Sequence, residues 1–217
     1  MTDFAERRTL MVDTQIRPSD VTKYPIIDAM LSVAREEFVP ANRREAAYVG
    51  ENLALGGARV ILEPRTLAKI LDALDIGQDE LVLDIAPSYG YSSAVIANLA
   101  EAVVAVEDDA DLIREAQEAL AAAGADNVIV QEGALAEGAQ EHGPYDVIVI
   151  QGGVANVPDA LIDQLKDGGR IAALFMDGAV GEVRLGYKKD GQLTWRLAFN
   201  AGAPILPGFE KLLQFTL

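Results

Sequence analysis

The stretch Leu81-Val82-Leu83-Asp84-Ile85-Ala86-Pro87-Ser88-Tyr89-Gly90-Tyr91 indicates the fold of this chain more strongly than any other segment. An apolar run ends in an acid, passes through a short turn and enters an apolar helical segment at 94–100. Strand, loop and helix in this order form the place where open α/β sheets bind dinucleotides and related cofactors. Such loops are normally rich in glycine, because a backbone without Cβ atoms can approach a ligand closely. Here Gly90 is the one glycine left, so the fold signal is strong and the binding signal is weakened.

Composition limits the classes of partner. The chain has 217 residues, enough for one domain with a full-sized core. Its 18 Lys and Arg residues stand against 34 Asp and Glu residues, for a formal net charge of −16. Because such a surface repels phosphate backbones and anionic lipids, we expect neither nucleic acid nor a membrane as partner. The lack of cysteine excludes disulfides, thiol catalysis and cysteine metal sites.

Location and metal binding follow from what the sequence lacks. The N-terminus is polar, and no apolar run approaches the length of a membrane span, so we expect a cytoplasmic protein. His142 is the single histidine and lies in a polar segment that predicts a surface position. We expect no metal site, and Asp108-Asp109 is explained as the start of a helix. Trp195 alternates with apolar neighbours, which favours a place in the core or at an interface. The oligomeric state is not indicated.

From Leu81 onward the pattern alternates between strands and helices. Uniformly apolar runs, typical of strands buried on both faces of a parallel sheet, predict strands near 81–85, 103–107, 128–131, 146–150 and 170–175. A helix is expected to open at Pro158 and to include Leu165. Beyond Phe175, polar and apolar residues alternate at Glu182–Tyr187, Gln192–Phe199 and Lys211–Leu217, with a hairpin signal at Asp190-Gly191. These segments predict an antiparallel end to the sheet.

The N-terminal part reads as a cover for this sheet. Apolar residues at helical spacing predict helices around 25–34 and 67–74. No linker rich in Gly, Ser or Pro separates them from the sheet. We therefore expect a single domain over 1–217, with a mainly helical cover at 1–77 and an α/β sheet core at 78–217.

Further motifs run through the chain in a fixed order. They are Met11-Val12-Asp13-Thr14-Gln15-Ile16-Arg17-Pro18, Glu37-Phe38-Val39-Pro40, Ala47-Tyr48, Asn52-Leu53, Glu63-Pro64, the Asp84–Gly90 loop, Glu107, Glu132-Gly133, Tyr145-Asp146 and the run from Val157 to Arg170. In order and spacing these motifs resemble the protein-L-isoaspartate O-methyltransferase family over almost the whole chain. The resemblance implies a class I methyltransferase fold, a Rossmann-like sandwich around a mostly parallel seven-stranded sheet.

The resemblance also implies an activity. Members of that family use S-adenosylmethionine to methylate carboxylates of damaged, isomerised aspartyl residues, so a protein or peptide would be the substrate. The acceptor carboxylate is already ionised at neutral pH, so catalysis depends on positioning and electrostatics more than on a general base.

The cofactor residues that the resemblance implies are partly altered. Asp84 and Glu107 stand at the expected strand ends, and Glu107 occupies the position that holds the ribose hydroxyls; its alternative reading is a helix-capping or solvated acid. The family's Gly-x-Gly-x-Gly loop is represented by Ala86, Pro87, Ser88, Tyr89 and Gly90, and Pro87 lacks a backbone donor. After Gly133 the family has an acid that meets the adenine amino group, where this chain has Ala134. Gln151 follows the fourth strand at the carboxyl edge of the sheet, and the sequence leaves open whether its side chain lines the pocket.

The substrate side departs further. The family's Gly-His-Gly-Gln-Thr-Ile-Ser-Gln-Pro corresponds here to the segment from Gly56 to Pro64, and Leu62 replaces the serine that meets the substrate carboxylate. Arg59 either compensates by binding a carboxylate or is a surface residue that pairs with an acid such as Glu63.

Three hypotheses remain open. The first is a methyltransferase related to the isoaspartyl enzymes, with weak cofactor binding and doubtful catalysis. The second is a non-catalytic family member that acts as a binding or scaffold protein. The third, a nicotinamide-dependent oxidoreductase, fits least because the glycines of its fingerprint are missing.

Overall fold

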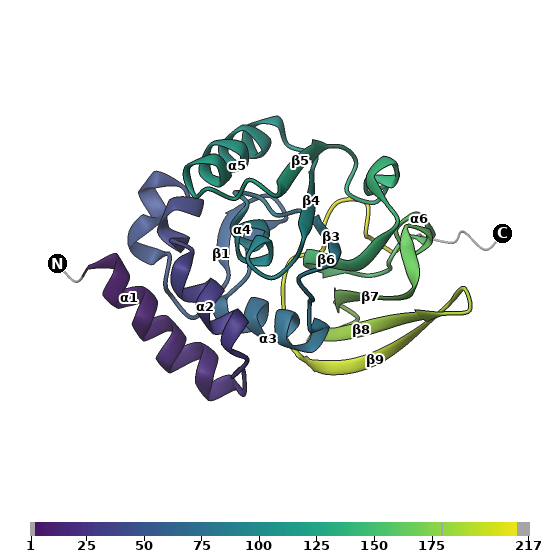
Figure 1. Cartoon of the computed structure of the whole chain (residues 1–217), viewed down its shortest axis with the longest axis horizontal. Helices are drawn as coiled ribbons and strands as arrows, with labels where there is room; N and C mark the ends of the chain where they lie inside the picture. Colours follow the sequence, from purple (N-terminus) through teal and green to yellow (C-terminus); the bar gives the residue numbers. More distant parts are fainter. Residues whose placement is uncertain (1–2, 179, 212–217) are drawn as a thin grey trace.

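The computed structural model describes residues 3–178 and 180–211, which form helices packed around a mostly parallel sheet (Figure 1). The helices are α1 (Phe4–Met11), α2 (Tyr24–Ser32), α3 (Pro64–Leu74), α4 (Tyr91–Ala97), α5 (Ala110–Ala122) and α6 (Asp159–Asp163). Short 3₁₀ or π segments lie at Val12–Ile16, Arg17–Ser19, Arg35–Phe38, Ala41–Ala46 and Gln140–His142. The strands are β1 (Leu53–Gly56), β2 (Arg59–Ile61), β3 (Leu81–Ile85), β4 (Ala102–Glu107), β5 (Val128–Glu132), β6 (Tyr145–Val154), β7 (Leu165–Phe175), β8 (Glu182–Lys189) and β9 (Gln192–Asn200).

The main sheet has seven strands in the order β5-β4-β3-β6-β7-β8-β9. β3 to β7 pair in parallel, whereas β8 runs antiparallel to β7 and β9 antiparallel to β8. This confirms the predicted fold class, a mostly parallel seven-stranded sheet with an antiparallel C-terminal end. The β8–β9 turn is at Asp190 and Gly191, both with positive φ, as the hairpin signal predicts. The segment predicted to alternate at 211–217 lies outside the described residues from 212 onward.

The central strands are buried on both faces. Along β3, Val82 belongs to one buried cluster, while Leu83 and Ile85 belong to another. The first cluster includes residues of α1 to α5, and the second includes α6 and the C-terminal segment with Leu206 and Phe209. Alternate side chains of one strand therefore serve two cores, as expected for covered parallel strands.

One local expectation is wrong. Leu165 begins β7 rather than continuing the preceding helix: α6 ends at Asp163, and Leu165 aligns with Tyr145 of β6 and is buried. Beside their helices, the residues before Gly77 contain a two-stranded antiparallel hairpin, β1–β2, which the helical pattern does not indicate. Gly56 and Gly57 allow its tight turn with φ values of 109° and 55°.

No helix within residues 3–178 and 180–211 is long and apolar enough to cross a membrane. The organisation as one domain over 1–217, with a cover at 1–77, stays a prediction.

Candidate functional site

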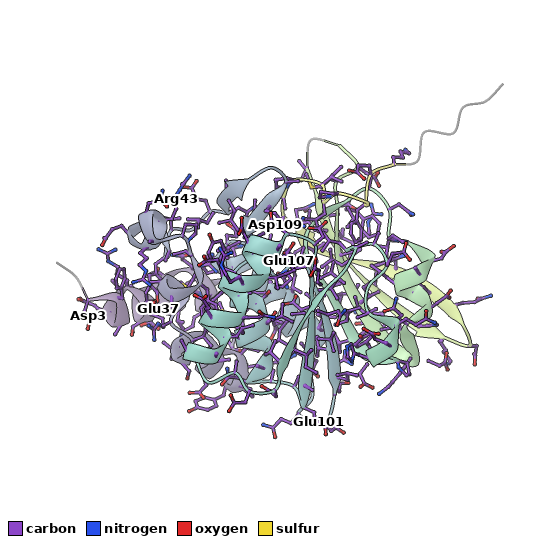
Figure 2. The ribbon with its side chains drawn as sticks, turned by 90° about the horizontal axis from the view of Figure 1, so that it is seen from above. Asp3, Glu37, Arg43, Glu101, Glu107 and Asp109 are labelled. Carbon is purple, nitrogen blue, oxygen red and sulfur yellow. The ribbon has the colours of Figure 1, made fainter. Side chains whose placement is uncertain are left out.

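The candidate site lies at the carboxyl ends of β3, β4 and β6, where ligands bind in open α/β sheets. Asp84, Glu107 and Gln151 come from these three neighbouring strands. Figure 2 shows Glu107 and Asp109 close together in the interior of the view and Glu101, which precedes β4, at its lower edge. The chain order of strands predicted this convergence.

Asp84 is fixed by hydrogen bonds from three side chains. Its carboxylate accepts from Ser92 Oγ (2.6 Å), Ser93 Oγ (2.7 Å) and Gln151 Nε2 (2.7 Å). The residue is fully buried, and this desolvation raises the pKa of Asp84 to about 6 against the opposing effect of the three donors. Asp84 and Gln151 are thus brought together as a buried pair, with their polar groups directed at one another.

The loop after β3 keeps a glycine-like backbone without the glycines. Ala86 and Ser88 have φ values of 60° and 56°, and Gly90 has 87°. Ala86 N donates to Val106 O (2.9 Å), and Gly90 N donates to Pro87 O (3.0 Å). A left-handed conformation costs an L-residue roughly 1–2 kcal/mol, so the loop at Ala86 and Ser88 is strained. Both residues are fully buried, and their Cβ atoms occupy space that glycine leaves free.

Glu107 is completely buried and surrounded by donors of its own chain. Its Oε1 accepts from Arg59 Nη2 (2.8 Å), Arg59 Nε (3.2 Å) and Asp108 N (3.0 Å), and its Oε2 accepts from Ser88 N (3.1 Å). Burial raises the pKa of Glu107 above its usual range, and the Arg59 charge opposes that shift. The alternative readings of Glu107 as a helix cap or solvated acid are wrong: Asp109 caps α5 by accepting from Asp111 N and Leu112 N.

Arg59 is part of this site rather than a surface residue. Its side chain is 10% exposed and pairs with both Glu107 and Asp108. The predicted pairing with Glu63 is wrong, because Glu63 accepts from Arg65 and from Thr66 Oγ1 (2.6 Å). The role of Arg59 toward a substrate carboxylate stays a prediction. Two buried polar atoms beside Glu107, Arg59 Nη1 and Ser88 Oγ, have no hydrogen-bond partner among the described residues.

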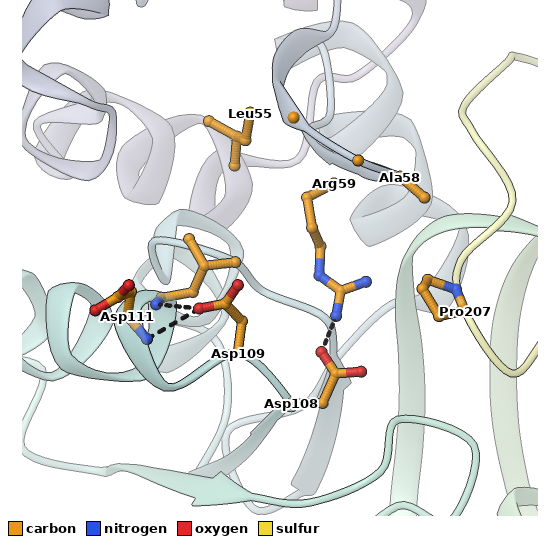
Figure 3. A pocket seen from close by; sticks show the side chains of 10 residues that line it. Leu55, Ala58, Arg59, Asp108, Asp109, Asp111 and Pro207 are labelled. Carbon is orange, nitrogen blue, oxygen red and sulfur yellow. Dashed lines mark hydrogen bonds and ion pairs between the residues drawn. The ribbon is translucent and has the colours of Figure 1, made fainter.

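A cavity of about 370 Å³ lies between the tip of the β1–β2 hairpin and the start of α5. Figure 3 shows Arg59 reaching from the hairpin toward Asp108, with Asp109 and Asp111 on one side of it and Pro207 on the other. The cavity is lined by Leu55, Gly56, Gly57, Ala58, Arg59, Asp108, Asp109, Asp111, Leu112 and Pro207. Its rim is acidic, and Arg59 is the cation among these ten residues.

Leu62 lies on a second, very small cavity. Its volume is about 10 Å³, and it is lined by Val60, Ile61, Leu62, Leu67, Pro87, Tyr91, Ser92 and Gln151. This is at or below the space that one water molecule needs. Ser92 and Gln151 are two of the three groups that bind Asp84, so Leu62 lies beside the Asp84 cluster, as the resemblance implies. The leucine side chain offers no donor there.

Arg35 binds the backbone of the segment that carries Leu62, and no pattern in the sequence singles it out. It is buried, donates to Ala47 O (2.7 Å) and Leu62 O (2.8 Å), and stacks over the Tyr91 ring at 4.5 Å. Burial lowers the pKa of Arg35. Ser92 and Ser93 were also missed, although two hydroxyls in the first turn of α4, eight and nine positions after Asp84, are a readable signal.

Among residues 3–178 and 180–211, the remaining residues singled out in the sequence contribute no side-chain hydrogen bond to the Asp84 and Glu107 clusters. Gly133 N donates to Glu107 O (3.0 Å), and Ala134 is exposed with no polar side chain. His142 is half-buried, and its Nε2 lies 3.7 Å from Glu141 Oε1. Trp195 packs its ring edge-on against Phe175 at 4.9 Å, which agrees with its predicted place against the core. Within the part of the chain that the structure describes, no group of three His, Asp or Glu residues is placed to hold a metal ion.

Comparison with known proteins now identifies the family. The family model Protein-L-isoaspartate(D-aspartate) O-methyltransferase (PCMT) matches residues 6–192. The chain belongs to this family. It is 37% identical over 171 residues to the protein-L-isoaspartate O-methyltransferase of Syntrophus aciditrophicus (strain SB), covering 79% of this chain and 78% of the relative. It is 31% identical to protein-L-isoaspartate O-methyltransferase 1 of Syntrophobacter fumaroxidans, covering 85% and 86%.

Solved structures agree on the fold. A protein-L-isoaspartate O-methyltransferase structure matches with a TM-score of 0.79 and 24% identity, over 95% of this chain and 66% of that one. A putative PCMT of Plasmodium falciparum in complex with S-adenosyl-L-homocysteine matches with a TM-score of 0.78 and 18% identity, over 92% and 97%. At this identity the two matches establish the class I methyltransferase fold of this family member. The predicted family resemblance is confirmed.

Proposed function

We propose that this PCMT-family chain transfers a methyl group from S-adenosylmethionine to a carboxylate of damaged aspartyl residues in proteins, with weak cofactor binding and low turnover. The observation that carries the proposal is the geometry around Glu107. The acid stands at the end of β4 against the Asp84–Gly90 loop, and Ser88 N of that loop donates to it at 3.1 Å. The loop holds glycine-type φ values although two glycines are replaced.

The residues present fit the nucleoside part of the cofactor. Ser88 Oγ is buried next to Glu107 without a partner among the described residues, and ribose hydroxyls would satisfy it. Glu107 and Ser88 would hold the ribose, and Gly133 and Ala134 would border the adenine. When bound, the cofactor supplies an electrophilic methyl group on its sulfonium. On the substrate side, the residues that would act near this methyl group are Leu62 and the members of the buried Asp84 cluster.

Three features support weak activity. Leu62 cannot donate a hydrogen bond to an acceptor carboxylate, and Ala134 cannot accept one from adenine. The space beside Leu62 is about 10 Å³, so a substrate group must push side chains apart to reach it. Each missing polar contact costs about 1–3 kcal/mol, or roughly 5- to 150-fold in binding.

A second candidate is a non-catalytic family member that works as a binding or scaffold protein. It is favoured by the same small cavity, because Leu62 fills a place where the family has a polar group. In that case the fold is retained and methyl transfer is not.

Ligand titrations followed by an activity assay test the proposal. Calorimetry with S-adenosylmethionine and with S-adenosylhomocysteine, followed by a methyl-transfer assay on an isoaspartyl peptide, separates the two candidates. Weak binding with slow transfer supports the methyltransferase. No binding at millimolar ligand supports the scaffold, and micromolar or tighter binding would show that other groups have rebuilt the pocket.

A further inference from the structure

The two carboxylate oxygens of Glu107 are already engaged inside the protein. Arg59 supplies two donors to Oε1, and Ser88 and Asp108 supply backbone donors. With the side chain fully buried, an incoming hydroxyl has no free approach to it. A ligand that uses this acid must therefore displace one of these donors. The Arg59 guanidinium is a side-chain donor, whereas Ser88 and Asp108 donate from the backbone, so Arg59 is the group that can move without a change in the main chain.

The segment that carries Arg59 is anchored at its base and free at its tip. At the base, Leu53, Val60 and Ile61 are buried, and Asn52 accepts from Glu63 N (2.8 Å) and donates to Gly202 O (2.6 Å). At the tip, Gly56 and Gly57 are exposed, and a Cβ atom added to either would meet nothing within 4 Å. The tip spans the cavity of about 370 Å³, and Arg59 is its ionic link to the far wall (Figure 3).

We infer that the tip of the β1–β2 hairpin, residues 55–59, is a lid that Arg59 latches onto Glu107 and Asp108. In this closed state Arg59 holds the oxygen that a bound ribose would use, so the chain inhibits its own cofactor site. Binding requires the guanidinium to leave Glu107, and the cofactor hydroxyls replace its hydrogen bonds. The identity of the competing ligand rests on the proposed function; the latch itself rests on the contacts of the free chain.

The latch is built to open. Arg59 Nη1 is buried and has no acceptor among the described residues, so the closed state leaves one donor of the guanidinium unsatisfied. Asp108 is 37% exposed, which allows water to replace its half of the interaction. The cavity beneath the tip gives the side chain room to turn without unpacking the core.

The first experiment uses the free protein and needs no ligand. Amide hydrogen exchange at 53–61 is measured in the wild type, in Arg59→Gln and in Arg65→Gln. Arg65 is the matched control, because it is 42% exposed and pairs with Glu63 outside the hairpin. We expect exchange in the hairpin to rise about 10- to 150-fold in Arg59→Gln and to stay unchanged in Arg65→Gln. Unchanged exchange in a folded Arg59→Gln protein overturns the latch.

The second experiment measures S-adenosylhomocysteine binding in the same proteins by calorimetry and stopped-flow kinetics. Opening before binding makes the observed association rate of the wild type level off with ligand concentration, whereas Arg59→Gln is expected to show a linear rise and about 5- to 150-fold tighter affinity. Weaker binding by Arg59→Gln would mean that Arg59 is a ligand contact and would overturn the inference. Asp108→Asn, which removes one half of the latch, is expected to change both quantities in the same direction by less, and it serves if Arg59→Gln does not fold. If neither wild type nor variants bind, the proposed function fails, and the exchange result still decides the latch.

Discussion

Arg59 Nη2 lies 2.8 Å from Glu107 Oε1, although 48 residues separate the two in sequence. Arg59 belongs to the segment that the family resemblance assigns to substrate, and Glu107 belongs to the part assigned to cofactor. A buried carboxylate needs such a partner, because an unpaired charge is expensive to remove from water. The two halves of the candidate site are therefore coupled through one ion pair.

This coupling predicts strong non-additivity in stability. Arg59→Gln and Glu107→Gln each leave one member of the pair unmatched, and each is expected to lower the free energy of unfolding by about 3 kcal/mol or more. The double variant should lose less than the sum of the two, with an interaction energy of about 1–3 kcal/mol. Urea unfolding of the four proteins measures the cycle. Additive losses would show that the 2.8 Å contact carries no net interaction.

The strained loop predicts that two substitutions toward glycine stabilise the protein. Ala86→Gly and Ser88→Gly relieve φ values of 60° and 56°, and each should raise the free energy of unfolding by up to about 1 kcal/mol. Ala86→Gly should also strengthen cofactor binding, since it removes a buried Cβ from the loop, whereas Ser88→Gly also removes the Oγ atom proposed to hold the ribose and should not. Gly90→Ala is the opposite control, because its Cβ would lie 3.2 Å from Leu120 at a φ of 87°. Thermal unfolding and ligand titration measure the effects; lower stability in both glycine variants would contradict the strain.

The sequence predicted the sheet better than it predicted the site, and the reasons are physical. Mostly apolar runs such as Leu81–Ile85 become buried without any specific partner residue, so their pattern alone identifies strands. Arg59 and Glu107 meet only because a hairpin folds across the end of β4, and that hairpin was not foreseen. Its turn depends on Gly56 and Gly57, two adjacent glycines with positive φ, a pair that by itself does not distinguish a hairpin turn from a loop. Arg35 was missed because it opens the charged run Arg35-Glu36-Glu37, and such a run normally indicates a solvent-exposed segment.

Asp84 predicts a measurable pH dependence of stability. Its pKa is raised to about 6 by burial, while that of an unfolded aspartate is 3.8. A raised carboxyl pKa contributes stability that is complete below about pH 4 and is lost as the pH rises through 6. Between these values the contribution changes by about 3 kcal/mol. Asp75, Glu80 and Asp146 have lowered pKa values and act in the opposite direction, so the test is the difference between wild type and Asp84→Asn. Denaturation curves from pH 4 to pH 7 should show that difference shifting in favour of Asp84→Asn; a constant difference contradicts the raised pKa.

The last prediction concerns the lost polar group at Leu62. Leu62→Ser alone should not raise turnover above that of the unmodified chain, because the adenine contact at Ala134 and the glycine loop are still missing. It should cost about 2–5 kcal/mol of stability as a buried leucine is removed. Val60→Ser is the matched control, since Val60 is buried on the same small cavity but is not the family's serine position. Adding Ala134→Asp and Ala86→Gly with Pro87→Thr should raise cofactor affinity first. Methyl transfer to an isoaspartyl peptide should then rise above the slow rate proposed for the unmodified chain only in combinations that include Leu62→Ser, and not in those that carry Val60→Ser instead. The assay across this series decides the matter, because robust turnover by the unmodified protein would mean that the chain positions the acceptor carboxylate without a donor at Leu62.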